Sequence, residues 1–321
     1  MSNLIIRVLQ EYDIRQPDSV IPFHEGQGFS GSDIWKVTYN SRFYCLKRWP
    51  DGKPSDQTRT LIQSVIPEVE QQGLPVAAPV ETRDGRRFVR IEKRWWDLSP
   101  WLPGTPGNAS TLTEAQLQQA MQWLARYHRL AAGIVSDVGQ SPAISYRHHF
   151  SRQLFDGSLN LLTERKYPGL DPGIADLFVS QANRRLPWLI NVLASFADSE
   201  LDLLPALSDV WSDHIFFQGE EISGVIDFGA IKLDSACLDI ARLLGSYATV
   251  DTSVFTRGIK YYRTERSLEQ QDVALVELFD QAHVVLAGLQ WLVWLGPEQR
   301  VFKQMEKVNQ HLKSLAQRID C

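Results

Sequence analysis

Apolar and polar residues follow two different periods along the chain, and the change of period divides it in two. Before residue 103, short runs rich in aromatic and β-branched residues predict strands, as in DIWKVTY (33–39) and RFYCLKRW (42–49). The Asn40-Ser41 pair between these runs predicts a tight hairpin. We therefore expect the N-terminal part to be built on an antiparallel sheet.

One segment of this N-terminal part has helical spacing instead. Residues 55–73 repeat apolar positions at the helical period and end at Gly73, which suits a helix C-terminus. Pro67 is expected to interrupt or kink this helix, because proline lacks the amide hydrogen that a helix interior uses. The strand pattern then returns in RRFVRI (86–91) and RWWDLSPWL (94–102).

After PGTPG (103–107) the apolar positions recur mainly at helical spacing. The helix predicted at 111–133 begins with a Thr-x-x-Glu capping pattern from Thr111 to Glu114, or with Thr113 as the cap itself. Further helices are predicted at 173–200, 236–248, 252–264 and 268–318, the last broken near Gly296-Pro297.

These patterns indicate an α+β chain of two lobes. A β-rich lobe is expected in residues 1–102, a hinge near 99–107 and a helical lobe in residues 103–321. With 321 residues, of which 44% are hydrophobic, the chain is long enough for each lobe to bury its own core.

Net charge indicates which partners the protein is expected to bind, and cysteine content indicates the compartment in which it is expected to work. A formal charge of −5 argues against nucleic acid as the partner, because phosphate binding needs a clustered basic surface. The basic clusters at 83–94 and 146–153 are interpreted as solvated faces. Cys45, Cys237 and Cys321 are few, odd in number and widely spaced, which argues against a disulfide framework or zinc site and indicates a reducing compartment.

No segment is expected to span a membrane. The most apolar stretch, 283–296, is too short for a bilayer and contains His283 and Gln290, so it is interpreted as a buried helix. The N-terminus shows neither a charged leader nor a small-residue cleavage site. A cytoplasmic location is therefore expected.

A glycine-rich stretch precedes the first predicted hairpin. In HEGQGFSGSDIWKV (24–37), Gly26, Gly28 and Gly31 satisfy the G-x-G-x-x-G spacing. A dinucleotide-binding fold would need a helix after these glycines, whereas a strand follows them here. A glycine loop between two strands is how kinase-like folds cover nucleotide phosphates. An ordinary loop is the alternative.

Two charged residues at strand positions are candidates for nucleotide and metal binding. Lys47 shares a strand face with Cys45 and Trp49, from which its charge could reach phosphates; a solvated edge position is the alternative, and Arg48 competes from the opposite face. Asp227 in VIDFG follows two β-branched residues, so it suits a strand end that presents a carboxylate to Mg²⁺. A simple turn aspartate is the alternative reading.

Taken in order, these features resemble the aminoglycoside phosphotransferase / choline kinase group of the protein-kinase-like fold. The resemblance covers roughly residues 20–250 and is most specific in SDVWSDHIFFQGEEISGVIDFGAIKLDSACLDIARLLGSY (208–247). It implies a bilobal fold with ATP between the lobes, and transfer of the γ-phosphoryl group to a hydroxyl of a small molecule. The acceptor site is expected in the helical lobe, with no nucleic-acid partner.

The family's catalytic loop reads His-Gly-Asp, four variable residues and Asn, and this pattern is only partly kept. The resemblance assigns Asp209 as the catalytic aspartate and Asp227 as the metal-binding one. Leu207, Ser208 and His214 stand where the family has His, Gly and Asn.

The resemblance also implies roles for other residues. The nucleotide would be held by Gly26, Gly28, Ser30, Gly31 and Lys47, with adenine against the hinge backbone from Leu98 to Trp101. Mg²⁺ or Mn²⁺ would be held by Asp227, with His214 or Asp213. Supporting roles fall on Asp239, which would brace the catalytic loop, and on His128. Independently of the resemblance, Asp234 is expected to cap the helix that contains Asp239, because aspartate is a preferred N-cap residue.

Two departures from the family pattern leave the activity open. Imidazole at His214 suits zinc, manganese or iron better than magnesium, so either the second metal site is altered or Asp213 supplies the oxygen. The helix 55–66 contains no glutamate to pair with Lys47, which could lie against Asp227 instead. An active small-molecule kinase, a pseudokinase that acts as a nucleotide-binding or interaction protein, and a different enzyme on the same fold are all carried forward.

Overall fold

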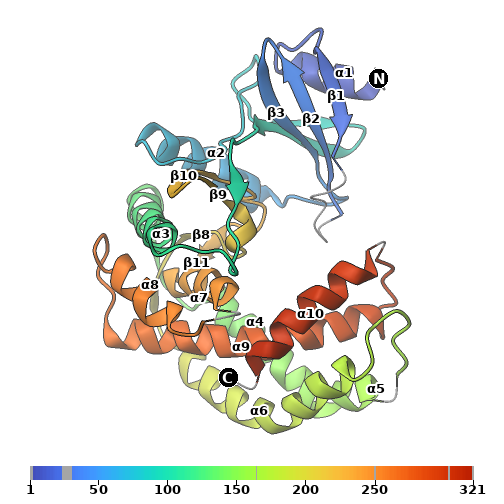
Figure 1. The fold of residues 1–321 in the computed structure, drawn as a ribbon, viewed down its shortest axis with the longest axis vertical. Helices are drawn as coiled ribbons and strands as arrows, with labels where there is room; N and C mark the ends of the chain where they lie inside the picture. Colours follow the sequence, from blue (N-terminus) through green and yellow to red (C-terminus); the bar gives the residue numbers. More distant parts are fainter. Residues whose placement is uncertain (1–2, 24–30, 164, 249–250, 303, 320–321) are drawn as a thin grey trace.

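The computed structural model describes residues 3–23, 31–163, 165–248, 251–302 and 304–319. Figure 1 shows a β-sheet with one covering helix at one end of the molecule, and packed helices at the other. Helix α2 and strands β9 and β10 lie between these two parts (Figure 1).

The N-terminal sheet has five antiparallel strands in the order β1-β2-β3-β5-β4. Their bounds are Ser19–Pro22, Asp33–Tyr39, Arg42–Arg48, Phe88–Ile91 and Arg94–Pro100 for β1 to β5. The predicted β2–β3 hairpin is confirmed, and Asn40 and Ser41 both have positive φ, 50° and 60°, as a two-residue type I′ turn requires.

Two helices accompany this sheet. Helix α1 (Asn3–Glu11), which the sequence pattern did not predict, buries Ile5, Val8 and Leu9. Helix α2 (Asp56–Gln71) is capped by the Ser55 side chain and continues past Pro67, so the proline does not end it. Gly73 follows with a φ of 82°, the left-handed conformation expected just after a helix.

The C-terminal part is mainly helical, as predicted. The helices are α3 (Glu114–Ile134), α4 (Pro142–Gln153), α5 (Leu159–Thr163), α6 (Ile174–Ala197), α7 (Ala236–Tyr247), α8 (Val254–Tyr262), α9 (Gln270–Leu295) and α10 (Met305–Ile319). A π-helical turn, Leu154–Ser158, joins α4 to α5; these two helices were not predicted. Thr113 is the N-cap of α3, and its capping-box partner is Gln116.

Two small antiparallel sheets connect the helices and carry the candidate catalytic segments. One has the order β10-β9-β6, with bounds Glu221–Val225, Ile215–Gln218 and Thr105–Pro106. The other has the order β11-β8-β7, with bounds Lys232–Asp234, Leu201–Ala206 and Asp137–Gly139. Asp209 lies in the connection from β8 to β9, and Asp227 follows β10 directly.

The buried side chains form two main clusters. The smaller one joins α1 to the N-terminal sheet, through residues such as Leu9, Val37, Leu46 and Trp96. The larger one fills the C-terminal part and also takes in Leu61, Ile62 and Val65 of α2. Helix α2 is therefore packed with the helical part, although it lies among the N-terminal strands in sequence. Within the described ranges, no helix is apolar and long enough to cross a membrane.

Candidate active site

Lys47 and Asp227 come together from the two parts of the chain. Lys47 projects from β3, and its Nζ donates to Oδ1 of Asp227 at 2.8 Å. The same Nζ lies 4.2 Å from the centroid of the Trp49 ring, which fits the shared strand face expected from alternation. The Lys47 side chain is 12% exposed, so the ion pair sits at the edge of the buried region. This contact links the N-terminal sheet to the segment after β10.

Both partners of this pair are held in their charged forms. Burial acts to raise the pKa of Asp227, but the charge of Lys47 and its hydrogen bond outweigh burial and hold that pKa well below its usual range. Burial acts to lower the pKa of Lys47, but the Asp227 and Asp97 carboxylates raise it above the usual value. Asp227 is thus a carboxylate, the form that a hard cation requires.

Asp97 is a site residue that the sequence reasoning missed. It lies on β5 directly across from Lys47 in the strand register and is 6% exposed. Its Oδ2 accepts a hydrogen bond from Trp49 Nε1 at 2.5 Å, and burial, opposed by the charge of Lys47, raises its pKa to about 6. The available signal was a carboxylate in the middle of the aromatic strand RWWDLSP. The carboxylates that act on Lys47 thus come from Asp97 and Asp227, and none comes from α2.

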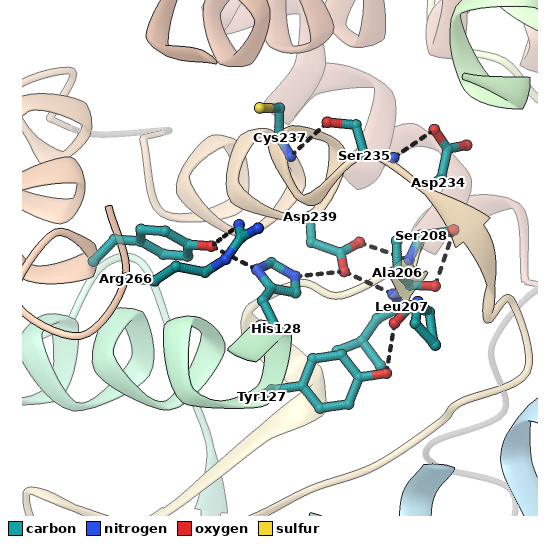
Figure 2. Close-up of polar contacts among 12 residues, drawn as sticks. Tyr127, His128, Ala206, Leu207, Ser208, Asp234, Ser235, Cys237, Asp239 and Arg266 are labelled. Carbon is teal, nitrogen blue, oxygen red and sulfur yellow. Dashed lines mark hydrogen bonds and ion pairs between the residues drawn. The ribbon is translucent and has the colours of Figure 1, made fainter. Parts of the chain in front are cut away.

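The backbone of the candidate catalytic loop is held by Asp239 of α7. The Asp239 carboxylate accepts hydrogen bonds from the amide of Leu207 at 2.6 Å and from that of Ser208 at 2.7 Å (Figure 2). Ser208 has a φ of 65°, a conformation that glycine adopts without strain and serine does not. The two charge-assisted bonds hold the loop that presents Asp209 in this conformation.

His128 of α3 lies on the other side of Asp239. Its Nε2 is 3.1 Å from Asp239 Oδ2 (Figure 2). Its Nδ1 is 2.9 Å from the Tyr262 hydroxyl. Next to it, the Tyr127 hydroxyl donates to the carbonyl of Pro205 at 2.7 Å. Burial lowers the pKa of His128 despite the Asp239 carboxylate beside it. His128 and Asp239 are fully buried, and their contacts fit the supporting roles expected for them.

Asp234 has a different role from the expected one. The N-cap of α7 is Ser235, whose side chain accepts from the amide of Cys237. Asp234 instead accepts from the Ser141 hydroxyl at 2.5 Å and from the Ala143 amide at 2.9 Å, both at the start of α4. The prediction of Asp234 as the α7 cap was therefore wrong, because the adjacent serine takes that position and frees the carboxylate to hold α4.

Asp209, the candidate catalytic residue, is exposed. Its side chain is 55% exposed, and Oδ1 accepts a hydrogen bond from Nη2 of Arg242 at 2.7 Å. Arg242 lies on α7, three positions after Asp239, and was not singled out from the sequence. The carboxylate proposed to take a proton is thus neutralised by a guanidinium in this structure.

His214 does not offer a free lone pair to a metal ion. Its Nε2 accepts from Nε1 of Trp211 at 2.7 Å, so Nδ1 carries the proton of the neutral ring, and Nδ1 is buried without a hydrogen-bond partner among the described residues. Asp213 is exposed and accepts from its neighbour Ser212 at 3.2 Å.

The described part of the chain contains no group of three or more His, Cys, Asp or Glu side chains placed to hold a metal. Asp227, His214 and Asp213 are therefore not assembled into one three-ligand centre. Asp227 alone fits Mg²⁺, because one carboxylate with phosphate oxygens and waters suffices for that ion. The neutral His214 ring, with its acceptor nitrogen already used, does not fit as a second ligand in this conformation.

The remaining nucleotide-site predictions fall partly outside the structure. Gly26, Gly28 and Ser30 lie outside the described residues, whereas Gly31 is described and has a φ of 72°. Leu98 is fully buried and its carbonyl accepts from the amide of Val80 at 2.7 Å. The amide of Trp101 donates to the carbonyl of Phe43 at 2.9 Å. These two hinge groups are therefore already paired within the protein.

A cavity of about 650 Å³ lies away from these residues, among α6, α8, α9 and α10. It is lined in part by Arg184, Trp188, Phe255, Glu277 and Arg318, and none of the predicted site residues contributes to it.

An antiparallel sheet that carries a buried lysine, joined by an ion pair to a helical part that carries two loop aspartates, defines a kinase-like class of protein. The chain belongs to the phosphotransferase enzyme family, whose model matches residues 24–271. The homoserine kinase of Rhodopseudomonas palustris (strain ATCC BAA-98 / CGA009) is 24% identical over 275 residues, which cover 83% of this chain and 78% of that enzyme. The homoserine kinase of Methylobacterium nodulans is 33% identical over 95 residues, 28% of this chain and 30% of that enzyme.

Solved structures show the same architecture. A spectinomycin phosphotransferase in complex with ADP and spectinomycin superposes with a TM-score of 0.68 at 14% identity, over 100% of this chain and 98% of that one. A microcompartment-associated aminopropanol kinase gives a TM-score of 0.65 at 14% identity, over 97% and 94% of the two chains. The predicted protein-kinase-like fold is thereby confirmed, and family and relatives together support a small-molecule phosphotransferase.

Proposed function

We propose that this protein is an ATP-dependent kinase that transfers the γ-phosphoryl group to a hydroxyl of a small molecule. The observation that carries the proposal is the 2.8 Å pair between Lys47 and Asp227, in a chain of the phosphotransferase family. Such a pair places a cation and a carboxylate where the two halves of a kinase site meet. Its natural setting would be the cytoplasm, where ATP is available.

The nucleotide side of the site would be formed by the sheet. Lys47 would contact the phosphates as a point charge, with Asp97 and Asp227 fixing its position. The loop containing Gly26, Gly28, Ser30 and Gly31 would bring backbone N–H groups to the same phosphates. Asp227 would hold Mg²⁺ or Mn²⁺, which supplies positive charge against the phosphate oxygens when bound.

The acceptor side would be formed by the catalytic loop. Asp209 would orient the acceptor hydroxyl and accept its proton during transfer. The hydroxyl oxygen would form a bond to the γ-phosphorus while the bond from that phosphorus to the β–γ bridging oxygen breaks. ADP is then released. Asp239 and His128 would act by holding the loop backbone. The names of the relatives suggest homoserine and aminopropanol as first acceptors to test.

The pseudokinase alternative is favoured by two observations. Arg242 neutralises Asp209, and the neutral His214 ring supplies no lone pair where the family keeps a metal-binding asparagine. A protein with these features could bind nucleotide with little turnover.

We expect Asp209→Ala to separate binding from chemistry. With MgATP or MnATP and a panel of hydroxyl acceptors, the wild type should form ADP in an acceptor-dependent way. Asp209→Ala should retain ATP binding, measured by calorimetry, but lose about 10²- to 10⁴-fold in turnover. Asp202→Ala, an exposed aspartate on β8, is the matched control.

Nucleotide binding without turnover on the whole panel would favour the pseudokinase. Absence of nucleotide binding would contradict both readings.

Asp97→Asn tests whether this carboxylate positions Lys47. Asparagine keeps an acceptor for the Trp49 indole but removes the charge beside Lys47. The KM for ATP is expected to rise about tenfold, equivalent to about 1.4 kcal/mol, because the lysine loses one of its two fixing charges. Steady-state kinetics with Asp51→Asn, an exposed turn residue, give the comparison. An unchanged KM would mean that Asp227 alone positions Lys47.

A further inference from the structure

Basic side chains gather next to Asp209, on the acceptor side of the proposed site. They come from four helices: Arg147 of α4, Arg242 of α7, His283 of α9 and His311 of α10, here called the basic cluster. None of them was assigned a role in the proposed phosphoryl transfer.

Arg242 connects the catalytic carboxylate to this cluster. Its Nη2 donates to Asp209 at 2.7 Å, while its Nη1 lies 3.2 Å from Nδ1 of His283 and contacts Nε2 of the same ring. The side chain of Arg242 is 16% exposed, against 55% for Asp209. Arg242 therefore lies below Asp209, between it and α9.

Arg147 lies against the same stretch of α9. Its guanidinium carbon is 5.2 Å from the centroid of the Phe279 ring, one helical turn before His283, and Nη1 donates to the carbonyl of Ala143 at 3.2 Å. Among the described residues, no ion pair with a carboxylate involves Arg147. A partly buried guanidinium of this kind is costly unless an anion completes its contacts.

The members of the cluster affect one another's ionisation. Burial and the charge of Arg242 lower the pKa of Arg147 to about 10. Burial, followed by Arg242, Arg147 and His311, lowers the pKa of His283 well below its usual value. His311, whose pKa burial and Arg242 lower to about 4, also interacts with Asp209. The positive charge of this region therefore comes from the Arg147 and Arg242 guanidiniums, beside two histidines whose uncharged form is favoured, and Arg242 brings it to the proposed catalytic carboxylate.

Nearby carboxylates have other partners in direct contact, although two of them also act on the cluster through their charge. Asp234 accepts from Ser141 and Ala143, and its charge acts on Arg147. Asp280 pairs with Arg318 at 2.5 Å and interacts with the charge of Arg242. Asp209 pairs with Arg242, but it must be available to a hydroxyl proton for the proposed reaction. Among the described residues, the Arg147 guanidinium therefore has no carboxylate in direct contact, and a bound anion would supply one.

We propose that the acceptor is a hydroxy compound carrying an anionic group, and that Arg147 and Arg242 bind this group while its hydroxyl lies at Asp209. The proposal rests on the proposed kinase function and specifies its substrate class. Guanidinium groups suit carboxylate and phosphate, because they offer parallel N–H donors to two oxygens.

The same contacts connect acceptor binding to the state of Asp209. Without acceptor, the guanidinium of Arg242 neutralises the Asp209 carboxylate. The acceptor's anion competes for that guanidinium, so its binding weakens the ion pair and leaves Asp209 able to take the hydroxyl proton. An anionic acceptor favours the state in which Asp209 is released from Arg242, because it binds that state more tightly than the paired state. A neutral acceptor, or water, lacks that interaction.

The test compares pairs of related acceptors with and without the anion. L-Homoserine is paired with 3-amino-1-propanol, which lacks its carboxylate, and D-glycerate with glycerol; glycerol 3-phosphate tests phosphate as the anion. In each pair kcat/KM is expected to favour the anionic member at least about tenfold, the effect of losing a hydrogen bond to a charged group. In Arg147→Met the preference should fall by a similar factor.

Two variants and a binding measurement complete the test. Arg147→Lys, which keeps the charge, should recover part of the preference, whereas a purely structural role would not distinguish charged from neutral acceptors. Arg152→Met, an exposed arginine on the same helix, is the control. Saturation-transfer NMR of L-homoserine and D-glycerate with AMP-PNP present reports acceptor binding without turnover.

The outcomes separate this inference from the proposed function. Equal or better turnover of the neutral members overturns the anionic acceptor but leaves the kinase function standing. Arg147-dependent binding of a carboxylate without turnover of any acceptor supports the anion site and contradicts the kinase function. Absence of both binding and turnover for every anionic probe overturns the inference.

Discussion

Asp227→Asn is expected to reduce acceptor-dependent ADP formation by about 10³-fold or more, the size of effect that a single charge-stabilising group has in phosphoryl transfer. Asparagine can still accept a hydrogen bond from Lys47, but it carries no charge to hold a divalent cation or to balance the lysine. The low pKa of Asp227 means that the wild-type residue is ionised throughout the working pH range, so the variant removes a full charge.

A second readout tests the metal role of Asp227 directly. In the wild type, Mg²⁺ should tighten ADP binding in calorimetry, and this tightening should disappear in Asp227→Asn. Glu221→Gln, an exposed carboxylate on β10, controls for the general loss of negative charge. Retention of both turnover and the Mg²⁺ effect in Asp227→Asn would place the metal on another residue.

Asp239→Ala is expected to be the most destabilising of the substitutions considered. It leaves the Leu207 and Ser208 amides without their acceptor and the His128 ring without its carboxylate partner, in a buried or partly buried setting. A buried donor left without a partner costs about 1–3 kcal/mol, so the three lost contacts together cost on the order of 3–5 kcal/mol. Because a loss of that size moves the midpoint by a few degrees per kcal/mol, Tm should fall on the order of 10 °C in scanning calorimetry.

In Asp239→Ala, the catalytic loop should lose its conformation at temperatures where the rest of the molecule is still folded. Ser208 is kept at positive φ by the Asp239 bonds, so Asp209 loses its position when they are removed. Turnover should therefore fall in Asp239→Ala even at temperatures where the protein remains folded. Asp202→Ala again serves as control, and a Tm change below about 2 °C in Asp239→Ala would show that water replaces the lost acceptor.

Local features of the site were predictable because they depend on a few consecutive residues. Strand alternation placed Lys47 on the face of Trp49, and the Asn40-Ser41 turn determined the hairpin. The absence of glutamate in the first part of α2 led to the expectation that Lys47 could meet Asp227, and the 2.8 Å contact confirms this.

Residues that depend on register or on distant packing were not predictable. Asp97 faces Lys47 only because β5 pairs with β3 in one register, fifty positions along the chain. Arg242 is one of several polar positions on an otherwise apolar helix, and its contact with Asp209 depends on how α7 packs below the loop. Asp234 was misassigned because two adjacent residues could each cap α7, and only the fold shows which one is needed at α4.

The packing of α2 has a consequence for movement within the molecule. The apolar face of α2 shares a core with the C-terminal helices, and Trp49 and Phe88 from the sheet end of the molecule belong to that same core, while the other buried side chains of the sheet pack with α1. Movement of the sheet away from α2 would therefore have to pull Trp49 and Phe88 out of the larger core and break the Lys47–Asp227 pair. Because the Trp49 ring also lies beside Lys47, one aromatic side chain takes part in both of these contacts between the sheet and the C-terminal part.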